Sequence, residues 1–280
     1  LIIAFTFLML RYLVFFPVYL THSIALGMDS LQFLLMVILT MLIAVSGYIS
    51  NDYFDVISDS INKPEKQYIG NQITAGTALA TALLLSLVTI AGSVWLSGLQ
   101  HSYMPAALLL LALAVAWWYA IRLKRTFLWG NIAVACMSAG TIVMAWLLEF
   151  HNQLPSEISA TITRIVTGIS IFAFLLSMLR EIMKDIEDVD GDKLINCKSL
   201  PIVKGIPITK TIMQIILIIT FILLVITQVF LFEFHRFIAV AWLLISVEIP
   251  LLYFAFMLQK SQTKADYHNL STLLKFIMLG

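Results

Sequence analysis

The chain has 280 residues, a mean hydropathy of +0.97 and a formal net charge of +1. Only 12% of its residues are charged, about half the share of a soluble domain, so a single soluble domain is excluded. The charge is close to neutral and no basic patch is interleaved with aromatic residues, so the sequence gives no indication of nucleic-acid binding.

Apolar runs along the chain predict eight transmembrane helices. Several are free of charge over about 20 residues, the length that an α-helix needs to cross about 30 Å of hydrocarbon. Residues 1–10 belong either to the first span or to a helix that leads into it, and a ninth span begins near Ser271. The predicted spans are 12–28, 31–50, 74–98, 103–121, 127–148, 161–180, 208–232 and 237–258. We therefore expect an all-α fold, a polytopic transmembrane helical bundle that forms one domain over residues 1–280 and is truncated at both ends.

Basic residues in the connecting loops predict the orientation of the chain. They gather in alternate loops, and by the positive-inside rule those loops face the cytoplasm. The opposite loops hold only Arg164 and Arg236. We expect an integral protein of the bacterial cytoplasmic membrane with its amino end inside. The basic set comprises Arg11, Lys63, Lys66, Arg122, Lys124, Arg125, Arg180, Lys184, Lys193, Lys198, Lys204, Lys210, Lys260, Lys264 and Lys275.

Three aspartates follow the second predicted span, in the stretch NDYFDVISD at residues 51–59. Asp52, Asp55 and Asp59 are spaced i, i+3, i+7, which places them on one face of a helix. Like charges at this spacing repel each other, and charges near hydrocarbon are costly, so a compensating cation is expected. A single aspartate near a helix end more often caps the helix or lies in solvent.

A second acidic stretch, REIMKDIEDVDGDKLINCKSLPIVKG, follows the sixth predicted span at residues 180–205. Asp185, Asp188 and Asp192 repeat the i, i+3, i+7 spacing. The segment DVDGDKLIN also aligns with the segment DVISDSIN when one extra residue is allowed. We interpret the two stretches as a weak internal repeat of a helix end that carries carboxylates, with both copies in loops predicted to face the cytosol.

The two triads together predict a magnesium site. Mg²⁺ prefers oxygen ligands and often takes one or two carboxylates together with substrate phosphates. Two carboxylate faces opposite each other would hold Mg²⁺ around a diphosphate, and lysines in the same loops would neutralise the remaining phosphate charge. A diphosphate at the cytoplasmic mouth and an apolar tail among the helices describe a prenyl diphosphate. The lysines are Lys66, Lys124, Lys184 and Lys198.

The stretches NDYFDVISDSINKPEKQYIG and REIMKDIEDVDGDKLINCKSLPI resemble the two Asp-rich signatures of UbiA-type intramembrane prenyltransferases. The resemblance covers nearly the whole chain and implies nine transmembrane helices, with the motifs after the second and the sixth. It also implies that both motifs bind Mg²⁺ and the diphosphate of a polyprenyl donor.

This resemblance implies a role for each site residue. Asn51 holds a carboxylate or a metal-bound water, and Tyr119 with Lys124 is similar to the Tyr–Lys element of the family. Lys66 stands where the family usually has arginine, and Val14 stands where its first helix has asparagine. The implied metal ligands are Asp52, Asp55, Asp59, Asp185, Asp188 and Asp192; the catalytic residues are Asp52, Asp55, Asp185, Asp188, Tyr119 and Lys124; the substrate-binding residues are Asn51, Lys66, Lys124, Lys184, Lys198 and Arg11.

The residues of both motifs are most similar to those of the digeranylgeranylglyceryl-phosphate-synthase-like branch of the family. That branch implies transfer of a geranylgeranyl group from its diphosphate to a glycerol-phosphate ether lipid, with the donor, the acceptor and the bilayer as partners. Prenylation of an aromatic quinone precursor is the alternative within the same fold, and an inactive scaffold stays open. A transporter or cation channel is the alternative from another class, since intramembrane acids mark ion pathways.

Five further residues need an interpretation. His22, in the first predicted span, is expected to hydrogen-bond a neighbouring helix. Glu248 either faces the interior of the bundle or marks a misplaced span boundary. Asn131 either lines the site or caps the fifth span. Cys136 and Cys197 form no spaced pattern, so two free thiols and no cysteine metal site are expected.

Overall fold

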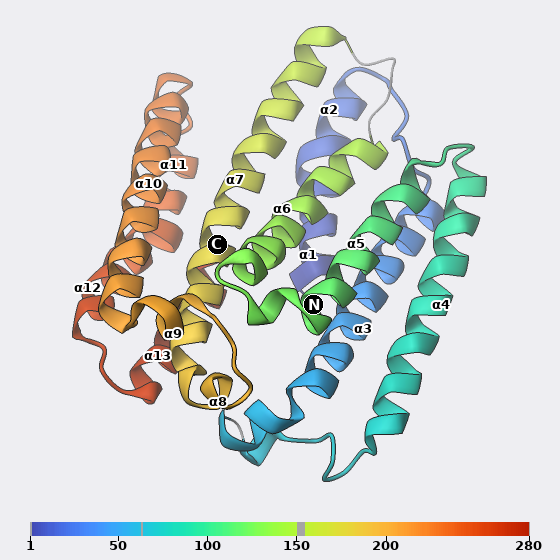
Figure 1. The fold of residues 1–280 in the computed structure, drawn as a ribbon. Coiled ribbons are helices and arrows are strands. Elements are labelled where there is room, and N and C mark those ends of the chain that lie inside the picture. Colours follow the sequence, from blue (N-terminus) through green and yellow to red (C-terminus); the bar gives the residue numbers. More distant parts are fainter. Residues whose placement is uncertain (1, 63, 150–154, 280) are drawn as a thin grey trace. The chain divides into compact units, whose positions relative to one another are not determined.

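The computed structural model describes residues 2–62, 64–149 and 155–279, and helices form nearly all of its regular structure (Figure 1). The exception within these ranges is one isolated bridge between Ile69 and Ile73. An apolar helix satisfies its backbone hydrogen bonds internally, as a segment surrounded by lipid must. Eight segments in the described ranges are long and apolar enough to cross a membrane, which confirms the predicted all-α bundle with eight spans. They are Ile2–Thr21, Ser30–Asn62, Ala75–Leu99, Met104–Ile121, Trp129–Glu149, Ser156–Glu187, Ile206–Glu233 and Phe237–Lys260.

Several boundaries differ from the predicted ones. The first span begins at Ile2 and ends at Thr21, so the prediction of residues 12–28 was wrong and residues 2–10 belong to the span. The second span continues through the first acidic stretch and ends at Asn62, whereas the sixth span continues into the second acidic stretch and ends within it at Glu187. A ninth span was predicted to begin near Ser271. The helix at this position, α13 (Lys264–Ile277), begins earlier and has 14 residues.

The chain divides into two compact units, and each is described by itself. Unit 1 comprises Leu1–Lys124 and Cys136–Ile171, and unit 2 comprises Arg125–Ala135 and Phe172–Gly280. The division falls within two helices, α6 (Trp129–Glu149) and α7 (Ser156–Glu187). A single domain over residues 1–280 stays a prediction.

In unit 1, small side chains allow three helices to pack closely. Ser46 on α3 donates a hydrogen bond to the carbonyl of Ala82 on α4 at 3.0 Å, and Trp117 on α5 donates to Ser86 at 2.9 Å. Such small and hydroxyl-bearing residues are the usual contacts between membrane helices. The elements of this unit are α1 (Ile2–Met9), η1 (Leu10–Phe15), α2 (Phe16–Thr21), α3 (Ser30–Asn62), η2 (Pro64–Lys66), α4 (Ala75–Leu99) and α5 (Met104–Ile121), with η3 (Leu123–Arg125) at its edge.

Unit 2 is organised around an apolar core between the end of α7 and the last helices of the chain. The buried residues include Leu179 and Ile182 of α7, Leu217 of α10, Leu251 of α12 and Leu274 of α13. This core fixes the end of α7, which carries the second acidic stretch. The elements are α8 (Val189–Leu194), α9 (Leu200–Lys204), α10 (Ile206–Glu233), α11 (Phe237–Leu243), η4 (Leu244–Glu248), α12 (Ile249–Lys260) and α13 (Lys264–Ile277).

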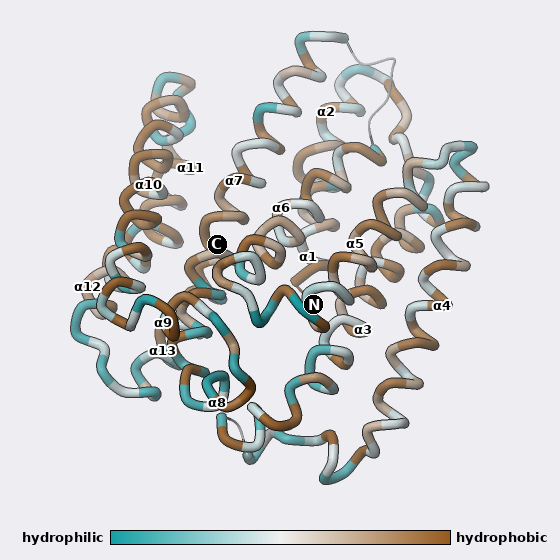
Figure 2. The backbone as a smooth tube through the Cα atoms, in the orientation of Figure 1, coloured by the Kyte–Doolittle hydropathy of each residue, from teal (hydrophilic) through white to brown (hydrophobic). Residues whose placement is uncertain are grey.

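Hydrophobic residues predominate along the long helices, and hydrophilic residues gather at helix ends and in the connections (Figure 2). The polar exceptions inside the spans are therefore the positions where chemistry or specific packing is expected. Glu248 is such an exception, because its side chain is 8% exposed although it lies within the last span. This burial confirms the first of its two interpretations, that it faces the interior of the bundle.

Candidate functional site

The first acidic stretch continues the helix of the second span, so its three aspartates lie on one face of α3 as predicted. Asp55 is the buried member, with 2% of its surface exposed, whereas Asp52 is exposed and Asp59 is partly buried. The amide of Asn51 donates a hydrogen bond to Asp55 Oδ2 at 2.6 Å. Lys124 of η3 forms an ion pair with the same oxygen. One carboxylate is therefore held by an amide and an ammonium group at the end of a membrane span.

The Lys124–Asp55 pair explains how α3 tolerates a buried carboxylate. A buried charge without a partner is strongly destabilising, whereas a paired and hydrogen-bonded one is tolerated. The side chains of Lys124 and Asp55 are 16% and 3% exposed. Tyr119, partly buried near the end of α5, precedes Lys124 by about one helical turn and a half at 3.6 residues per turn. Sequence reasoning placed this lysine among the phosphate-binding residues, and in unit 1 it contacts a proposed metal ligand.

Asn51 supplies a further observation at this position. Its Nδ2 is used by Asp55, but its buried Oδ1 accepts no hydrogen bond from the described residues. Buried polar oxygens normally have a partner, so an orphaned one points to a group bound in the functional state. A cation or its coordinated water fits an orphaned amide oxygen beside a carboxylate. The donor set of unit 1 is thus of the kind that Mg²⁺ prefers.

The second acidic stretch in unit 2 departs from the predicted single helical face. The helix α7 ends at Glu187, Asp188 forms the junction with φ −97° and ψ 3°, and Asp192 lies on the short helix α8. The hydrogen bonds of a helix still pass through the junction, from Asp188 N to Lys184 O at 2.9 Å and from Asp192 N to Asp188 O at 3.1 Å. The prediction of one continuous helix was therefore wrong at Asp188, where the axis is interrupted.

Asp185 and Asp192 are held by different partners. Asn131, from the first turn of α6, donates its amide hydrogen to Asp185 Oδ2 at 2.8 Å. Asp192 is 4% exposed, and its backbone carbonyl accepts a hydrogen bond from Cys197 N at 3.0 Å. Asn131 thus contacts the acidic stretch, the first of the two roles that the sequence left open for it. Each unit contains an asparagine amide that donates to a motif aspartate.

The remaining charged groups of the second stretch include an ion pair between neighbours and a contact to a histidine of the last helix. Arg180 pairs with its neighbour Glu181 at 2.5 Å, and His268 of α13 contacts Glu187 at 2.8 Å. Lys184 is partly buried and Lys198 is exposed. Lys198 N donates to the carbonyl of Arg125 at 3.0 Å, which fixes the backbone there. Lys66 belongs to η2, and its side chain lies outside the described part of the chain.

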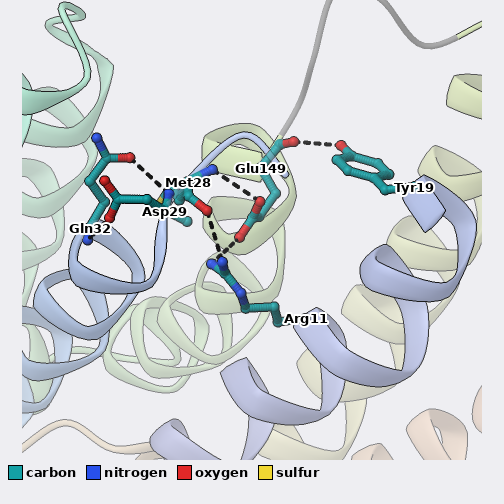
Figure 3. A network of polar contacts seen from close by, with 6 residues as sticks. All are labelled: Arg11, Tyr19, Met28, Asp29, Gln32 and Glu149. Atoms are coloured by element: carbon teal, nitrogen blue, oxygen red, sulfur yellow. Dashed lines mark hydrogen bonds and ion pairs between the residues drawn. The ribbon is translucent and has the colours of Figure 1, made fainter. Parts of the chain in front are cut away.

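Arg11 belongs to a network of polar contacts with Glu149 and Met28 (Figure 3). Its guanidinium pairs with Glu149 Oε1 at 2.6 Å and donates to the carbonyl of Met28 at 2.8 Å. Met28 precedes the start of α3, whereas Asp55 lies 25 residues beyond Ser30, about 38 Å along a helix that rises 1.5 Å per residue. We assign Arg11 to the packing of unit 1, and its role as a substrate-binding residue stays a prediction.

Glu149 was missed by sequence reasoning, although it is a charged residue at the end of an apolar run. Its carbonyl accepts a hydrogen bond from the hydroxyl of Tyr19 at 2.5 Å, and its Oε2 accepts one from Met28 N at 3.3 Å. Arg11 and Tyr19 reach the same residue because η1 is a π-helical turn. Eight steps of an ordinary α-helix would place the side chains of Arg11 and Tyr19 about 80° apart around the helix axis. The one extra residue that the π-helical turn holds offsets about 100° of rotation, so the two side chains point to nearly the same side.

Three minor predictions are also decided by the structure. His22 follows the end of α2 at Thr21 and is exposed, so the prediction that it lies inside the first span was wrong. Cys136 and Cys197 are free thiols, as predicted. Among the residues that the structure describes, no group of three or more His, Cys, Asp or Glu side chains is placed to hold a metal ion.

The fold and the site define a class: an integral membrane protein, built from helices, that carries carboxylates and lysines at the ends of its spans. Eight apolar spans place the chain in this class. The sequence profile of the UbiA prenyltransferase family matches residues 4–278, and the chain belongs to this family. The resemblance noted on the two Asp-rich stretches is confirmed at the level of the family.

Similar curated proteins carry the name digeranylgeranylglyceryl phosphate synthase. The chain is 35% identical to that of Saccharolobus solfataricus over 182 residues, which are 65% of this chain and 60% of that protein. It is 30% identical to that of Methanosphaera stadtmanae over 236 residues, 84% of this chain and 79% of that protein. The matched region therefore spans less than two thirds of the Saccharolobus protein.

Two solved structures are similar in fold. One, from work on the biosynthesis of digeranylgeranylglyceryl phosphate synthase in membranes, has a TM-score of 0.59 at 21% identity and covers 90% of this chain and 83% of that one. The other is a UbiA homologue from Archaeoglobus fulgidus bound to DMAPP and Mg²⁺, with a TM-score of 0.57 at 14% identity, covering 90% of this chain and 88% of that one. At these identities the likeness supports the fold.

Proposed function

We propose that this protein transfers a polyprenyl group, specifically a geranylgeranyl group, from its diphosphate to a glycerol-phosphate ether lipid in a Mg²⁺-dependent reaction. Family membership supports the reaction class, and the name shared by the archaeal relatives supports the acceptor. The observation that carries the proposal is the buried carboxylate of Asp55, held by Asn51 and Lys124 at the end of a membrane span.

The carboxylates of both stretches are proposed to hold the metal. When bound, Mg²⁺ supplies positive charge that stabilises the departing diphosphate. In unit 1, the Asn51 amide fixes the carboxylate of Asp55, and its buried Oδ1 supports a bound group beside it. In unit 2, Asn131 fixes Asp185 in the same way. The proposed ligands are Asp52, Asp55, Asp59, Asp185, Asp188 and Asp192.

Basic and phenolic side chains are proposed to hold the phosphate oxygens. Lys124 already lies beside a proposed metal ligand, so a phosphate bound there would gain its charge without a large movement of the side chain. Lys184 is one turn before Asp188 and belongs to the same acidic stretch. Tyr119 is proposed to donate a hydrogen bond. Lys66 and Lys198 are proposed to attract the anionic donor from the loops, and Arg11 is left out because of its position.

The side of the membrane follows from the loop charges. We propose that both acidic stretches face the cytoplasm, since the lysine-rich loops belong on that side. A charged donor made in the cytosol would then reach the site without crossing the bilayer. The bacterial cytoplasmic membrane stays a prediction, and the relatives named above come from archaea.

Product analysis by mass spectrometry tests the proposal. The purified chain is incubated with geranylgeranyl diphosphate, with and without Mg²⁺, against a panel of glycerol-phosphate and aromatic acceptors. We expect a prenylated glycerol-phosphate ether and release of pyrophosphate only with Mg²⁺. Products from aromatic acceptors alone would favour the quinone-precursor alternative, and no release of pyrophosphate with any acceptor would overturn the proposal.

Variants of the two clusters sharpen this test. Asp55→Asn and Asp185→Asn should each slow transfer about 10²–10³-fold, the usual effect of removing one group that stabilises transition-state charge. The matched control is Asp190→Asn, an exposed acid of the same stretch that lies outside the triad spacing. If Asp55→Asn and Asp185→Asn are as active as the control Asp190→Asn, Asp55 and Asp185 are removed from the proposed ligands.

A further inference from the structure

A small pocket opens on the surface of unit 2 between the start of α10 and the end of α12. Its volume is about 360 Å³, and it is lined by Ile206, Pro207, Lys210, Thr211, Gln214 and Gln259. None of these residues belongs to the proposed prenyl-transfer site. The lining offers an ammonium group, a hydroxyl and two amides, which are all groups that donate hydrogen bonds to phosphate.

Lys210 is the cation of this pocket, and its position is fixed by two contacts. Its Nζ donates to the carbonyl of Ser261 at 2.5 Å and lies 5.5 Å from the ring centre of Tyr267. An ammonium group has three hydrogens, so the bond to Ser261 leaves two for a ligand. Asp266 is the acid that acts on Lys210 from the α13 side, and its carboxylate is already engaged by the backbone of Gln262 and Thr263.

The faces of α10 and α12 that line the pocket carry apolar side chains farther along each helix, towards the middle of the membrane. Pro207, Thr211 and Gln214 are spaced i, i+4, i+7, and the same face continues through Ile218 and Ile222, which are 58% and 54% exposed. The residues on α12 that share the face of Gln259 are Phe256 and Leu252, each 58% exposed. In Figure 2 the tube of α10 is hydrophobic over most of its length.

The chemistry of this surface matches one kind of occupant. A polar, cationic pocket lies at the end of a membrane span, and an exposed apolar face runs from it into the hydrocarbon region. From Thr211 to Ile222 this face extends about 16 Å at 1.5 Å per residue, close to half of the ~30 Å hydrocarbon thickness. Lys260, whose Nζ lies 4.1 Å from the centre of the Phe256 ring, adds a second cation at the same helix end.

We propose that this surface binds an anionic phospholipid of the bilayer, with its phosphate headgroup in the pocket at Lys210 and its chains along α10 and α12. Basic pockets between transmembrane helices are known to hold anionic headgroups. The lipid would bridge the start of α10 to the end of α12. The lipid would also contact Lys210, which is hydrogen-bonded to the connection that leads into α13.

Counting bound lipid by native mass spectrometry tests the proposal. The full chain is purified without prenyl diphosphate or Mg²⁺, stripped of lipid, and mixed with phosphatidylglycerol or phosphatidylcholine. We expect phosphatidylglycerol to bind at least about fivefold more tightly, since one lysine near an anionic headgroup contributes that factor. Glycerol phosphate and inorganic phosphate are added as competitors, and neither should displace the lipid, because neither has chains to cover the apolar face.

Two variants locate the binding site. Gln259→Glu places a negative charge in the pocket wall on an exposed residue and leaves the Lys210–Ser261 bond intact, so phosphatidylglycerol should bind about fivefold more weakly. Lys210→Gln should have an effect in the same direction. The control is Gln72→Glu, the same change on an exposed turn of unit 1. Equal binding of both lipids, or equal loss in Gln259→Glu and Gln72→Glu, would overturn the proposal whatever the outcome of the prenyl-transfer assay.

Discussion

Lys124 and Asp55 form a partly buried ion pair although 69 residues separate them in the sequence. The lysine comes from the turn after α5, and the carboxylate comes from the end of α3. The pair therefore connects the ends of two spans of unit 1 at the position where a charged donor is proposed to bind.

A double-mutant cycle measures the strength of this pair. Asp55→Asn and Lys124→Gln should each lower the free energy of unfolding by about 3–5 kcal/mol, because each leaves one buried charge without its partner. The double variant should lose clearly less than the sum, since it removes both charges. Unfolding in detergent, followed by tryptophan fluorescence, provides the measurement. Losses that simply add would show that the two side chains do not interact.

Asn131 should act on the metal through Asp185. Asn131→Leu keeps most of the volume but removes the amide that donates to Asp185 Oδ2 at 2.8 Å. Loss of such an outer partner typically weakens metal affinity or activity about 10–100-fold. We expect the Mg²⁺ concentration for half-maximal transfer to rise by that factor, and Asn131→Asp to behave differently because it adds a charge. An unchanged Mg²⁺ dependence in Asn131→Leu would show that Asp185 needs no positioning.

The Arg11–Glu149 pair should affect stability and leave Mg²⁺ dependence unchanged. Both side chains are at most 4% exposed, so Arg11→Met or Glu149→Gln leaves a buried group unpaired and should cost about 3–5 kcal/mol. Arg11→Met combined with Glu149→Leu should recover much of that loss. The unfolding midpoint and the Mg²⁺ titration are measured on the same samples. A large shift of the Mg²⁺ titration without loss of stability would return Arg11 to the substrate-binding residues.

The start of α13 should respond to acid through Asp266. Backbone N–H groups of Gln262 and Thr263 hydrogen-bond its carboxylate and hold its pKa below the ordinary value of 3.8. The stabilisation is therefore fully present above the pKa of the unfolded chain and is lost as the pH falls through the lower pKa of the folded chain.

Comparison with Asp266→Asn isolates this effect. The unfolding midpoint of the native chain should exceed that of the variant at about pH 7, and the difference should vanish below both pKa values. Thr263, which completes the capping box with Asp266, is unchanged in the variant. A difference that does not shrink as the pH falls below 3.8 would contradict the assignment of the stabilisation to the ionised carboxylate.

Spans and acidic stretches were predictable from the sequence because both depend on local patterns. Long apolar runs dictate membrane helices, and the i, i+3, i+7 spacing of Asp52, Asp55 and Asp59 places them on one face when the helix continues. The same spacing failed to predict the break at Asp188. The residues around Asp188 do not mark the interruption, since Gly191 lies three residues later. The helical hydrogen bonds also continue through the junction.

Partners distant in sequence could not be predicted. The choice of Lys124 for Asp55 and of Asn131 for Asp185 depends on which helix ends become neighbours within each unit, and no local pattern encodes that. The pairing of Arg11 was missed because its charge was interpreted as that of a cytoplasmic loop and of a substrate-binding residue. In the structure its charge is neutralised by Glu149 within the protein, so it is not evidence for an aqueous loop.

The wide turn η1 makes the first span sensitive to the length of the chain more than to the identity of its side chains. A deletion of the outward-facing Leu13 would let an ordinary α-helix replace the turn, and the seven α-helical steps left between Arg11 and Tyr19 would keep both side chains on the same side, whereas one inserted residue would rotate Tyr19 about 100° away from Glu149. Substitutions at Leu13 would leave that geometry alone. Insertions in this short segment should therefore be far rarer among functional variants than substitutions of its lipid-facing residues.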